Sequence, residues 1–248
     1  DYQAPNFAIQ SVFLDFSLNP IKTIVQSTLK ITRLSSGPLV LKGEDLELLS
    51  LQVNGQAYRY FELHAKELVL HDLPNEFDLE ITCSNNPLEN TSLMGLYVSS
   101  GNFFTQCEAE GFRKITYFLD QPDVLTLFTV KLTAAKKDYP ILLSNGNLIQ
   151  EEELSDDRHS ATWEDPFPKP SYLFAIVAGQ LSVLEKTITT QSGKEKLLQI
   201  WVEKKDLSKT QHAMDSLIKA ITWDENRFGL ELDLDRFMIV AVGDFNMG

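Results

Sequence analysis

The stretch Val12-Phe13-Leu14-Asp15-Phe16-Ser17-Leu18 sets the fold class. Apolar side chains occupy every even position in it, which is the two-residue period of a strand with one buried face. Residues 77–83 and 128–132 repeat this pattern. Asn54-Gly55 supplies the two positive φ angles of a type I′ hairpin turn, and Asn145-Gly146 predicts a second turn of this kind. The sequence is therefore mainly β and predicts an antiparallel β-sandwich over residues 1–180.

The pattern changes after residue 180. A hairpin is predicted over Thr187–Val202, and a helix follows it, with a capping box formed by Ser208 and Gln211. The helix has an apolar stripe at 3.6-residue spacing and ends at Gly229. The stripe consists of Met214, Leu217, Ile218 and Ile221. The run Phe237–Val242 is apolar throughout, as in a strand buried on both faces of a sheet. Residues 181–248 thus predict the incomplete start of an α+β domain, cut off on a central strand.

Composition excludes several classes of protein. The chain has 248 residues, 22 Lys and Arg against 35 Asp and Glu, and a net charge of −13. A nucleic-acid or anionic-membrane binder needs clustered basic residues, so we expect neither partner. No run of 18 apolar residues occurs, so no membrane-spanning helix is expected. Two cysteines, Cys83 and Cys107, are too few for a disulfide framework and favour buried free thiols in a cytoplasmic protein.

The four histidines show no metal-binding spacing. None stands in His-Glu-x-x-His or pairs with a cysteine at zinc-finger spacing. His64 and His71 are seven residues apart in a strand-rich region, so they are predicted to point to opposite faces of a sheet. The sequence therefore predicts no metal ligand in this chain.

One polar cluster stands out, formed by Gln106, Glu108 and Glu110. In an extended segment these side chains, at every second position, would point to the same face of the strand. Carboxylates held together repel one another, so such a cluster either faces water or receives a cation. Composition favours the solvated face and leaves the cation site open.

Three long motifs resemble the bacterial-type aminopeptidase N family of zinc metallopeptidases. The first is Thr105-Gln106-Cys107-Glu108-Ala109-Glu110-Gly111-Phe112-Arg113 with its continuation Tyr117-Phe118-Leu119-Asp120-Gln121-Pro122-Asp123. The second is Asp165–Gly179, and the third is Asp244-Phe245-Asn246-Met247-Gly248, which is similar to the lead-in to the family's Gly-Ala-Met-Glu-Asn motif. The resemblance extends from Tyr2 to Gly248 and implies that 181–248 begin a thermolysin-like catalytic domain.

The resemblance implies that Glu108 binds the free α-ammonium of a peptide substrate and that Gln106 lines the same subsite. It also implies that Met247 cushions the first side-chain pocket, that Gly248 begins the exopeptidase motif, and that the Glu108–Ala109 peptide bond is cis. Glu110 and Arg113 are expected to be structural. The family's zinc ligands have no counterpart here, so zinc belongs to the full-length enzyme, and this chain is expected to bind none and to be inactive alone.

Two functions are weighed. The first is a fragment of a zinc-dependent aminopeptidase that removes the N-terminal residue from peptides. The alternative is a non-catalytic β-sandwich module that binds partner proteins. Gln106 and Glu108 favour the first. A domain cut off on an apolar strand also predicts self-association of the fragment through residues 181–248.

Overall fold

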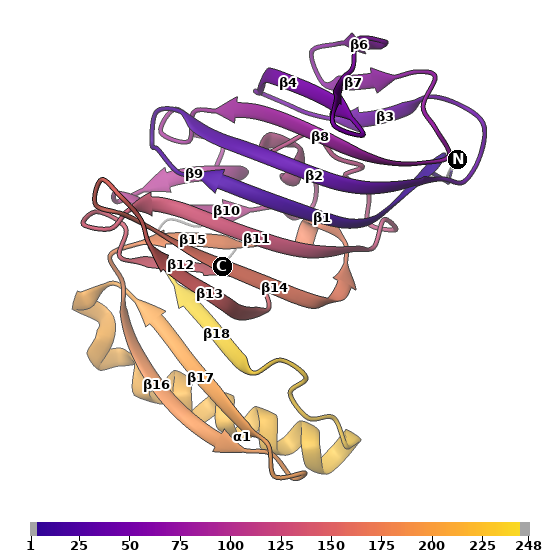
Figure 1. Cartoon of the computed structure of the whole chain (residues 1–248). Coiled ribbons are helices and arrows are strands. Elements are labelled where there is room, and N and C mark those ends of the chain that lie inside the picture. The colour runs from indigo at the N-terminus through magenta and orange to yellow at the C-terminus, as the bar shows by residue number, and fades with distance from the viewer. Residues whose placement is uncertain (1–3, 244–248) are drawn as a thin grey trace. The chain divides into compact units, whose positions relative to one another are not determined.

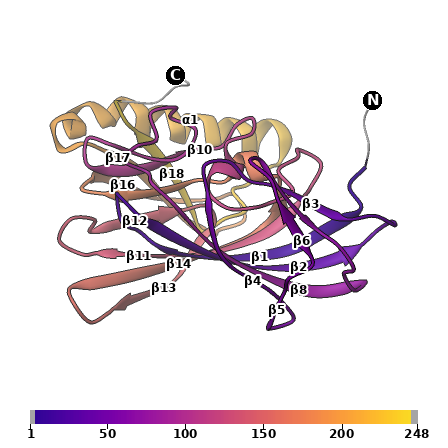
Figure 2. The same cartoon turned by 90° about the horizontal axis from the view of Figure 1, so that it is seen from above.

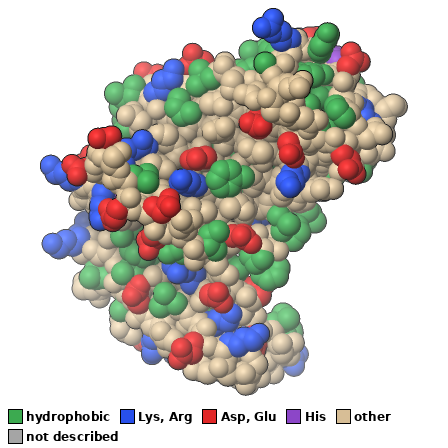
Figure 3. All heavy atoms as spheres, viewed as in Figure 1, with side chains coloured by type: hydrophobic (Ala, Val, Ile, Leu, Met, Phe, Trp, Pro, Cys, Tyr) green, Lys and Arg blue, Asp and Glu red, His purple; other side chains and the backbone are tan. Residues whose placement is uncertain are grey.

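The computed structural model describes residues 4–243, which form mainly strands (Figure 1). They divide into two compact units, Asp1–Gly179 and Gln180–Gly248. No helix among the described residues is long and apolar enough to cross a membrane. On the face drawn in Figure 3, acidic and basic side chains are interspersed, and neither sign forms a continuous patch.

An eight-stranded sheet is the largest element of the first unit. Its strands, in spatial order, are β13 (Asn147–Glu153), β14 (Arg158–Lys169), β11 (Thr126–Ala135), β1 (Phe7–Ser17), β2 (Thr23–Arg33), β8 (Glu76–Asn85), β4 (Glu47–Val53) and β5 (Gln56–Ala57). The predicted alternation is confirmed, because the even-numbered apolar residues of β1 from Val12 onward are buried. The sheet is not purely antiparallel, since β1 and β11 run parallel.

Two smaller sheets complete the first unit. One has the order β12 (Ile141–Ser144), β15 (Ile176–Gly179), β10 (Asn102–Gln106) and β9 (Gly95–Ser99). The other has the order β3 (Leu39–Lys42), β7 (Glu67–Leu70) and β6 (Phe61–Leu63). The indole of Trp163 on β14 donates to the Leu142 carbonyl on β12 at 3.1 Å, which joins the large sheet to the four-stranded one. The sandwich prediction is confirmed in this form.

Of the two predicted Asn-Gly turns, one is a hairpin. Asn54 and Gly55 have φ angles of 51° and 73° and join β4 to β5, as predicted. Asn145-Gly146 does not make a hairpin, because β12 and β13 belong to different sheets. A Cβ on Gly146 would lie 2.2 Å from the Glu164 carbonyl oxygen, so the glycine permits a close approach where the chain passes between sheets.

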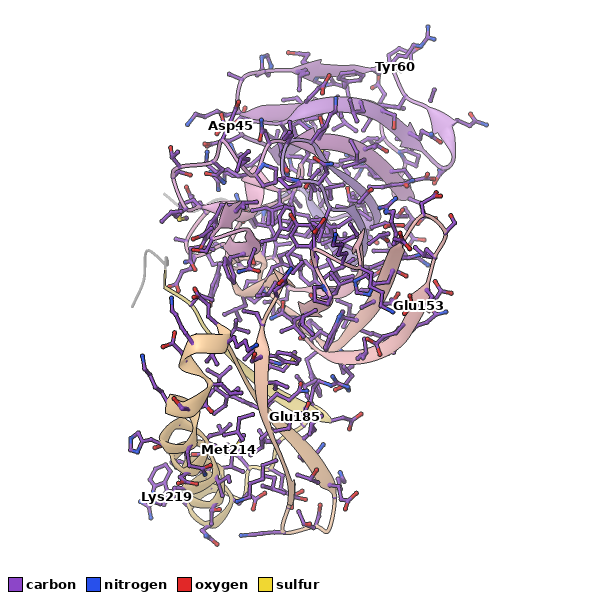
Figure 4. The ribbon with its side chains drawn as sticks, turned by 90° about the vertical axis from the view of Figure 1, so that its left-hand side faces the viewer. Asp45, Tyr60, Glu153, Glu185, Met214 and Lys219 are labelled. Carbon is purple, nitrogen blue, oxygen red and sulfur yellow. The ribbon has the colours of Figure 1, made fainter. Side chains whose placement is uncertain are left out.

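The second unit is a three-stranded sheet with one helix. Its strands are β16 (Ser182–Thr189), β17 (Glu195–Val202) and β18 (Arg236–Ala241), and α1 (Thr210–Phe228) lies along one face of them (Figure 2). Met214 lies between helix and strands, whereas Lys219 lies on the opposite side of the helix (Figure 4). Within the described residues β18 pairs with β17 alone and Phe237 is 39% exposed, so this strand is an edge strand and is not buried on both faces.

The helix ends were predicted with mixed success. Gly229 has a φ of 66° and its N–H donates to the Glu225 carbonyl, so the predicted C-cap is confirmed. The predicted capping box is wrong. Ser208 lies within a 3₁₀ helix, η3 (Lys204–Lys209), which leads directly into α1, and Lys209 at the N-cap makes no side-chain capping bond. The 3₁₀ turn supplies the entry to the helix that the capping box was expected to provide.

Candidate functional site

Strand β10 carries the first predicted site residue, Gln106, at its end. All five residues of β10 are buried, and the strand pairs with β9 on one side and β15 on the other. The Thr105 hydroxyl receives the Ile176 N–H at 2.9 Å, which adds a side-chain bond to the β10–β15 pairing. Gln106 itself is 5% exposed and stands opposite Gly95 of β9. The site therefore begins on an interior strand.

The chain turns immediately after Gln106. Residues 108–110 form a turn that is closed by a hydrogen bond from the Gly111 N–H to the Cys107 carbonyl at 2.7 Å. The Gln106 side-chain amide donates to the Glu108 carbonyl at 3.0 Å. The peptide bond between Glu108 and Ala109 is cis, as the resemblance implies. The predicted convergence of the three side chains on one face is wrong, because the strand ends at Gln106: Gln106 is buried, whereas Glu108 and Glu110 are exposed on the turn that follows.

The turn packs tightly against the strand that it leaves. A Cβ on Gly111 would lie 2.3 Å from the Gln106 carbonyl oxygen and 2.9 Å from the Gly95 nitrogen. No side chain fits at those distances, so any larger residue at position 111 must push the turn away from β10. Close backbone packing on its C-terminal side thus couples the position of Glu108 to Gly111 and to the η1 residues that follow.

The Glu108 carboxylate is exposed and makes no hydrogen bond or ion pair with any described residue. The two cations nearby along the chain are engaged elsewhere. The Lys114 ammonium lies 2.5 Å from an Asp45 carboxylate oxygen, and Arg113 Nη1 lies 3.2 Å from Glu110 Oε2. Glu108 therefore retains an unneutralised negative charge that can receive a cation from outside the chain.

A buried ion pair anchors the segment that follows the turn. Asp120 is 3% exposed, and its Oδ2 accepts from the Arg113 backbone N–H at 3.2 Å and from Arg113 Nε at 2.9 Å. Its Oδ1 accepts from the Ser171 hydroxyl at 2.6 Å. These bonds tie η1 (Phe112–Lys114) to η2 (Ser171–Leu173). Arg113 therefore has the structural role that was expected of it.

Both thiols are buried and free, as predicted. Burial raises the pKa of Cys107 well above its ordinary value, and the nearby Asp120 charge raises it further. Burial likewise raises the pKa of Cys83 to about 12. A thiol is nucleophilic only as the thiolate, so neither cysteine can act as a nucleophile near neutral pH.

The prediction for His64 and His71 is wrong. Their Nε2 atoms lie 3.2 and 3.0 Å from the two oxygens of one carboxylate, that of Glu62. The prediction assumed one continuous strand, but His64 follows β6 and His71 follows β7, two paired antiparallel strands that bring both imidazoles to Glu62. Within residues 4–243, no three His, Cys, Asp or Glu side chains are arranged to hold a metal ion, so this part of the chain does not fit a zinc site.

A comparison with known protein families finds one whose profile matches most of the first unit. The profile of the Peptidase M1 N-terminal domain matches residues 17–173, which contain β10, the turn and Asp120. The chain belongs to this peptidase M1 family. It is 49% identical over 250 residues to aminopeptidase N of Escherichia coli (strain K12) and 48% identical over 254 residues to that of Haemophilus influenzae. Each alignment covers the whole chain but only 29% of the relative, so the chain spans less than a third of their length.

Two solved peptidase structures share the fold. Aminopeptidase A of Legionella pneumophila, solved in complex with aspartic acid, superimposes with a TM-score of 0.93 over 99% of this chain and 30% of that one, at 36% identity. An M1 zinc metallopeptidase of Deinococcus radiodurans, solved as an E323A mutant bound to a Tyr-Ser-Ala substrate, gives a TM-score of 0.78 at 17% identity. It covers 95% of this chain and 56% of that one, and at this identity it supports the fold alone.

The structure reaches only part of the predicted site. It brings Gln106 and Glu108 together at one end of β10, whereas Met247 and Gly248 lie outside the described residues. No role was predicted for Asp120 or Ser171, although both lie within the motifs that resemble the family. One signal was available for Asp120, because it follows the apolar run Tyr117-Phe118-Leu119, where a lone carboxylate requires a buried partner.

Proposed function

We propose that this chain is the part of an M1 metallo-aminopeptidase that recognises the free N-terminus of a peptide, with Glu108 as the acceptor for the α-ammonium. The observation that carries this proposal is the exposed Glu108 carboxylate, which has no partner among the described residues and stands on a turn packed against an interior strand. Membership of the family supports it, as do the aminopeptidase relatives.

The physical basis is a difference of one charge. A peptide's free end carries an ammonium, whereas an internal peptide bond presents a neutral amide. A carboxylate binds the ammonium through a short charge-assisted hydrogen bond, and an internal amide would leave it unpaired. Fixing the terminus also selects which peptide bond is cleaved. Gln106, whose Nε2 is occupied by the Glu108 carbonyl, would contribute its Oε1 as a second acceptor.

Zinc and a cytoplasmic location belong to the same proposal. The bound metal supplies Lewis-acid and water-activating chemistry in the complete enzyme. Because residues 4–243 do not fit a zinc site, the proposal assigns the ligands to other residues and derives no step through the metal. The cytoplasmic location is supported by the two free thiols, which are compatible with a reducing compartment.

The proposal is tested in the full-length protein with Glu108→Gln, which removes the charge and keeps the shape. An exposed ion pair contributes at most about 1 kcal/mol, whereas truncating one side of a desolvated pair costs about 2–4 kcal/mol. We expect kcat/KM for a dipeptide to fall by about 30- to 1000-fold, as for a site that closes over its substrate. Glu110→Gln, on the same turn, is the matched control, because the Glu110 side chain is 69% exposed and its ion pair with Arg113 contributes little.

A binding measurement separates anchoring from other effects on turnover. Inhibition constants are compared for an amino-acid amide and for its analogue lacking the amino group. Wild type and Glu110→Gln should prefer the amine, and Glu108→Gln should lose that preference. An unchanged preference in Glu108→Gln would refute the ammonium anchor. A full-length protein with no peptidase activity at all would favour the non-catalytic module.

The 248-residue chain alone should show no turnover of an aminoacyl chromogenic substrate and no stoichiometric zinc after washing with a chelator. The residues described in it offer no metal site, and metal-dependent hydrolysis needs one. Zinc analysis of the washed chain and a rate assay with added zinc check this. A 1:1 zinc content with turnover would show that the chain is a self-sufficient enzyme.

A further inference from the structure

We propose that Asp120 is a positioning residue, which acts through Arg113 to hold Glu108 where it meets the substrate ammonium. This inference rests on the proposed function, because it assigns Asp120 a role at the Glu108 site. Asp120 itself touches neither Glu108 nor any surface that a substrate could reach, being 3% exposed.

Asp120 is bonded to two segments that flank β10. Three of its acceptor contacts come from Arg113: the backbone N–H and Nε donate to Oδ2 at 3.2 and 2.9 Å, and Nη2 donates to the Asp120 carbonyl at 3.1 Å. The fourth comes from Ser171, at 2.6 Å to Oδ1. Ser171 leads into β15, the strand paired with β10, and Arg113 follows the turn that leaves β10. The Asp120 carboxylate thus joins η1, which follows the Glu108 turn, to η2, which precedes β15.

A displacement of Arg113 is expected to move Glu108, because the short backbone segment between them is tightly packed. Gly111 lies against the Gln106 carbonyl so closely that a Cβ would overlap it, and its N–H is bonded to Cys107. The turn therefore cannot absorb a shift of η1 by sliding along β10. Without the Asp120 charge, Arg113 loses its buried acceptor, and the C-terminal end of the Glu108 turn is no longer anchored through Arg113. A displacement of about 1 Å at a catalytic site is enough to reduce turnover by up to roughly 100-fold.

If Asp120 only stabilised the fold, removing any comparable buried ion pair of the first unit would lower kcat/KM equally. The chain contains such a pair, which serves as a matched control. Asp165 and Lys169 form another buried ion pair in the same unit, 2.5 Å apart, with side chains 9% and 10% exposed. The Lys169 ammonium lies 5.2 Å from the centre of the Phe128 ring. Among the described residues, neither side chain makes a hydrogen bond or ion pair with the turn after β10, with Arg113 or with Asp120. Asp165→Asn should therefore destabilise the same unit while leaving the Arg113–Asp120 connection intact.

The experiment is a double-mutant cycle on the full-length protein, using Glu108→Gln, Asp120→Asn, their combination, and Asp165→Asn. We expect kcat/KM for a free-amino substrate to fall roughly 10- to 100-fold in Asp120→Asn and to change less than about twofold in Asp165→Asn. If Asp120 acts through Glu108, adding Asp120→Asn to Glu108→Gln should lower kcat/KM by less than about threefold further, since the two effects are not additive.

The outcomes separate the two proposals. Unchanged kcat/KM in Glu108→Gln overturns the ammonium anchor, and the Asp120 inference falls with it. A large loss in Glu108→Gln with additive or absent effects of Asp120→Asn overturns the positioning role alone, as does an equal loss in Asp165→Asn. If Asp120→Asn does not fold, Ser171→Ala replaces it in the cycle. That variant removes a single hydrogen bond and should lower kcat/KM roughly 2- to 10-fold, again only when Glu108 is present.

Discussion

The two units differ in how their cores are closed. In the first unit, aromatic side chains from several segments meet around Phe112, whose ring centre lies 4.9 Å from that of Phe118 and 5.1 Å from that of Phe174. In the second unit, the cluster of buried apolar residues has five members among the described residues, and α1 covers the sheet on one face. The members are Leu198, Ile200, Val202, Met214 and Ile221. Exposed apolar side chains occur in both units, so exposure alone does not distinguish them.

This difference explains where a precise site can be built. The turn that carries Glu108 runs directly into η1, whose Phe112 is fully buried in the aromatic core. A core contributed by many segments resists movement of any one of them, since interiors are close-packed. Over residues 180–243 the second unit has a three-stranded sheet that ends at β18 and one α-helix packed on it, so its elements have fewer partners to hold them. The proposed anchor therefore stands on the more constrained unit.

The largest effect should come from opening the aromatic core. Phe112→Ala removes a fully buried ring and should lower the free energy of unfolding of the first unit by about 3–5 kcal/mol. Met214→Ala in the second unit should cost about 2–3 kcal/mol. Hydrogen exchange, followed by mass spectrometry, measures the two units separately. An equal or larger loss in Met214→Ala would show that the core of the second unit is closed as well as that of the first.

Sequence reasoning predicted the parts of this fold that depend on local periodicity. The alternation in β1, the stripe around Met214 and the cap at Gly229 were all found, because each follows from the positions of neighbouring side chains. Pairing between distant strands was not predictable in this way. The parallel alignment of β1 with β11 joins residues more than a hundred positions apart, and no local pattern encodes it.

The site shows the same limit. Motif resemblance selected Gln106 and Glu108, but the prediction of one shared face placed Glu110 beside them because it assumed that β10 continued. The strand ends at Gln106, and the turn that follows packs tightly on Gly95, a contact between separate segments that local periodicity does not predict. Asp120 and Ser171 are 51 residues apart, so their hydrogen bond was likewise beyond a reading of one sequence.

A smaller effect should follow from the exposed aromatic pair on α1. Trp223 and Phe228 are each 58% exposed, and their ring centres are 5.3 Å apart in an edge-to-face contact. Replacing both with serine should change the free energy of unfolding by about 1 kcal/mol or less, because little buried area is lost. The predicted self-association of the chain should weaken, as measured by sedimentation. Unchanged association would place the contact elsewhere, for example along β18.

The smallest effect concerns charge, and its sign should differ between the units. Burial raises the pKa of Asp15, which lies opposite Lys131 in mid-sheet, despite the opposing influence of Lys131 and Arg158. In the second unit, a hydrogen bond from Lys209, 2.6 Å long, lowers the pKa of Asp206. Asp15 is thus less easily ionised in the folded chain than in the unfolded chain, whereas Asp206 is more easily ionised in the folded chain.

The pH dependence follows from these directions. A raised folded-state pKa gives stability that is present below the unfolded value of 3.8 and is lost as pH rises through the folded pKa. Asp15→Asn should therefore stabilise the chain near neutral pH, by about 0.5 kcal/mol or less, and the gain should vanish below pH 3.8. A lowered pKa has the opposite sign, so Asp206→Asn should destabilise the chain near neutral pH, and that loss should fade as pH falls below 3.8. Urea-unfolding curves between pH 3 and pH 7 measure both differences. If Asp15→Asn also destabilised the chain near neutral pH, the attraction of Lys131 and Arg158 would outweigh the effect of burial on the Asp15 carboxylate.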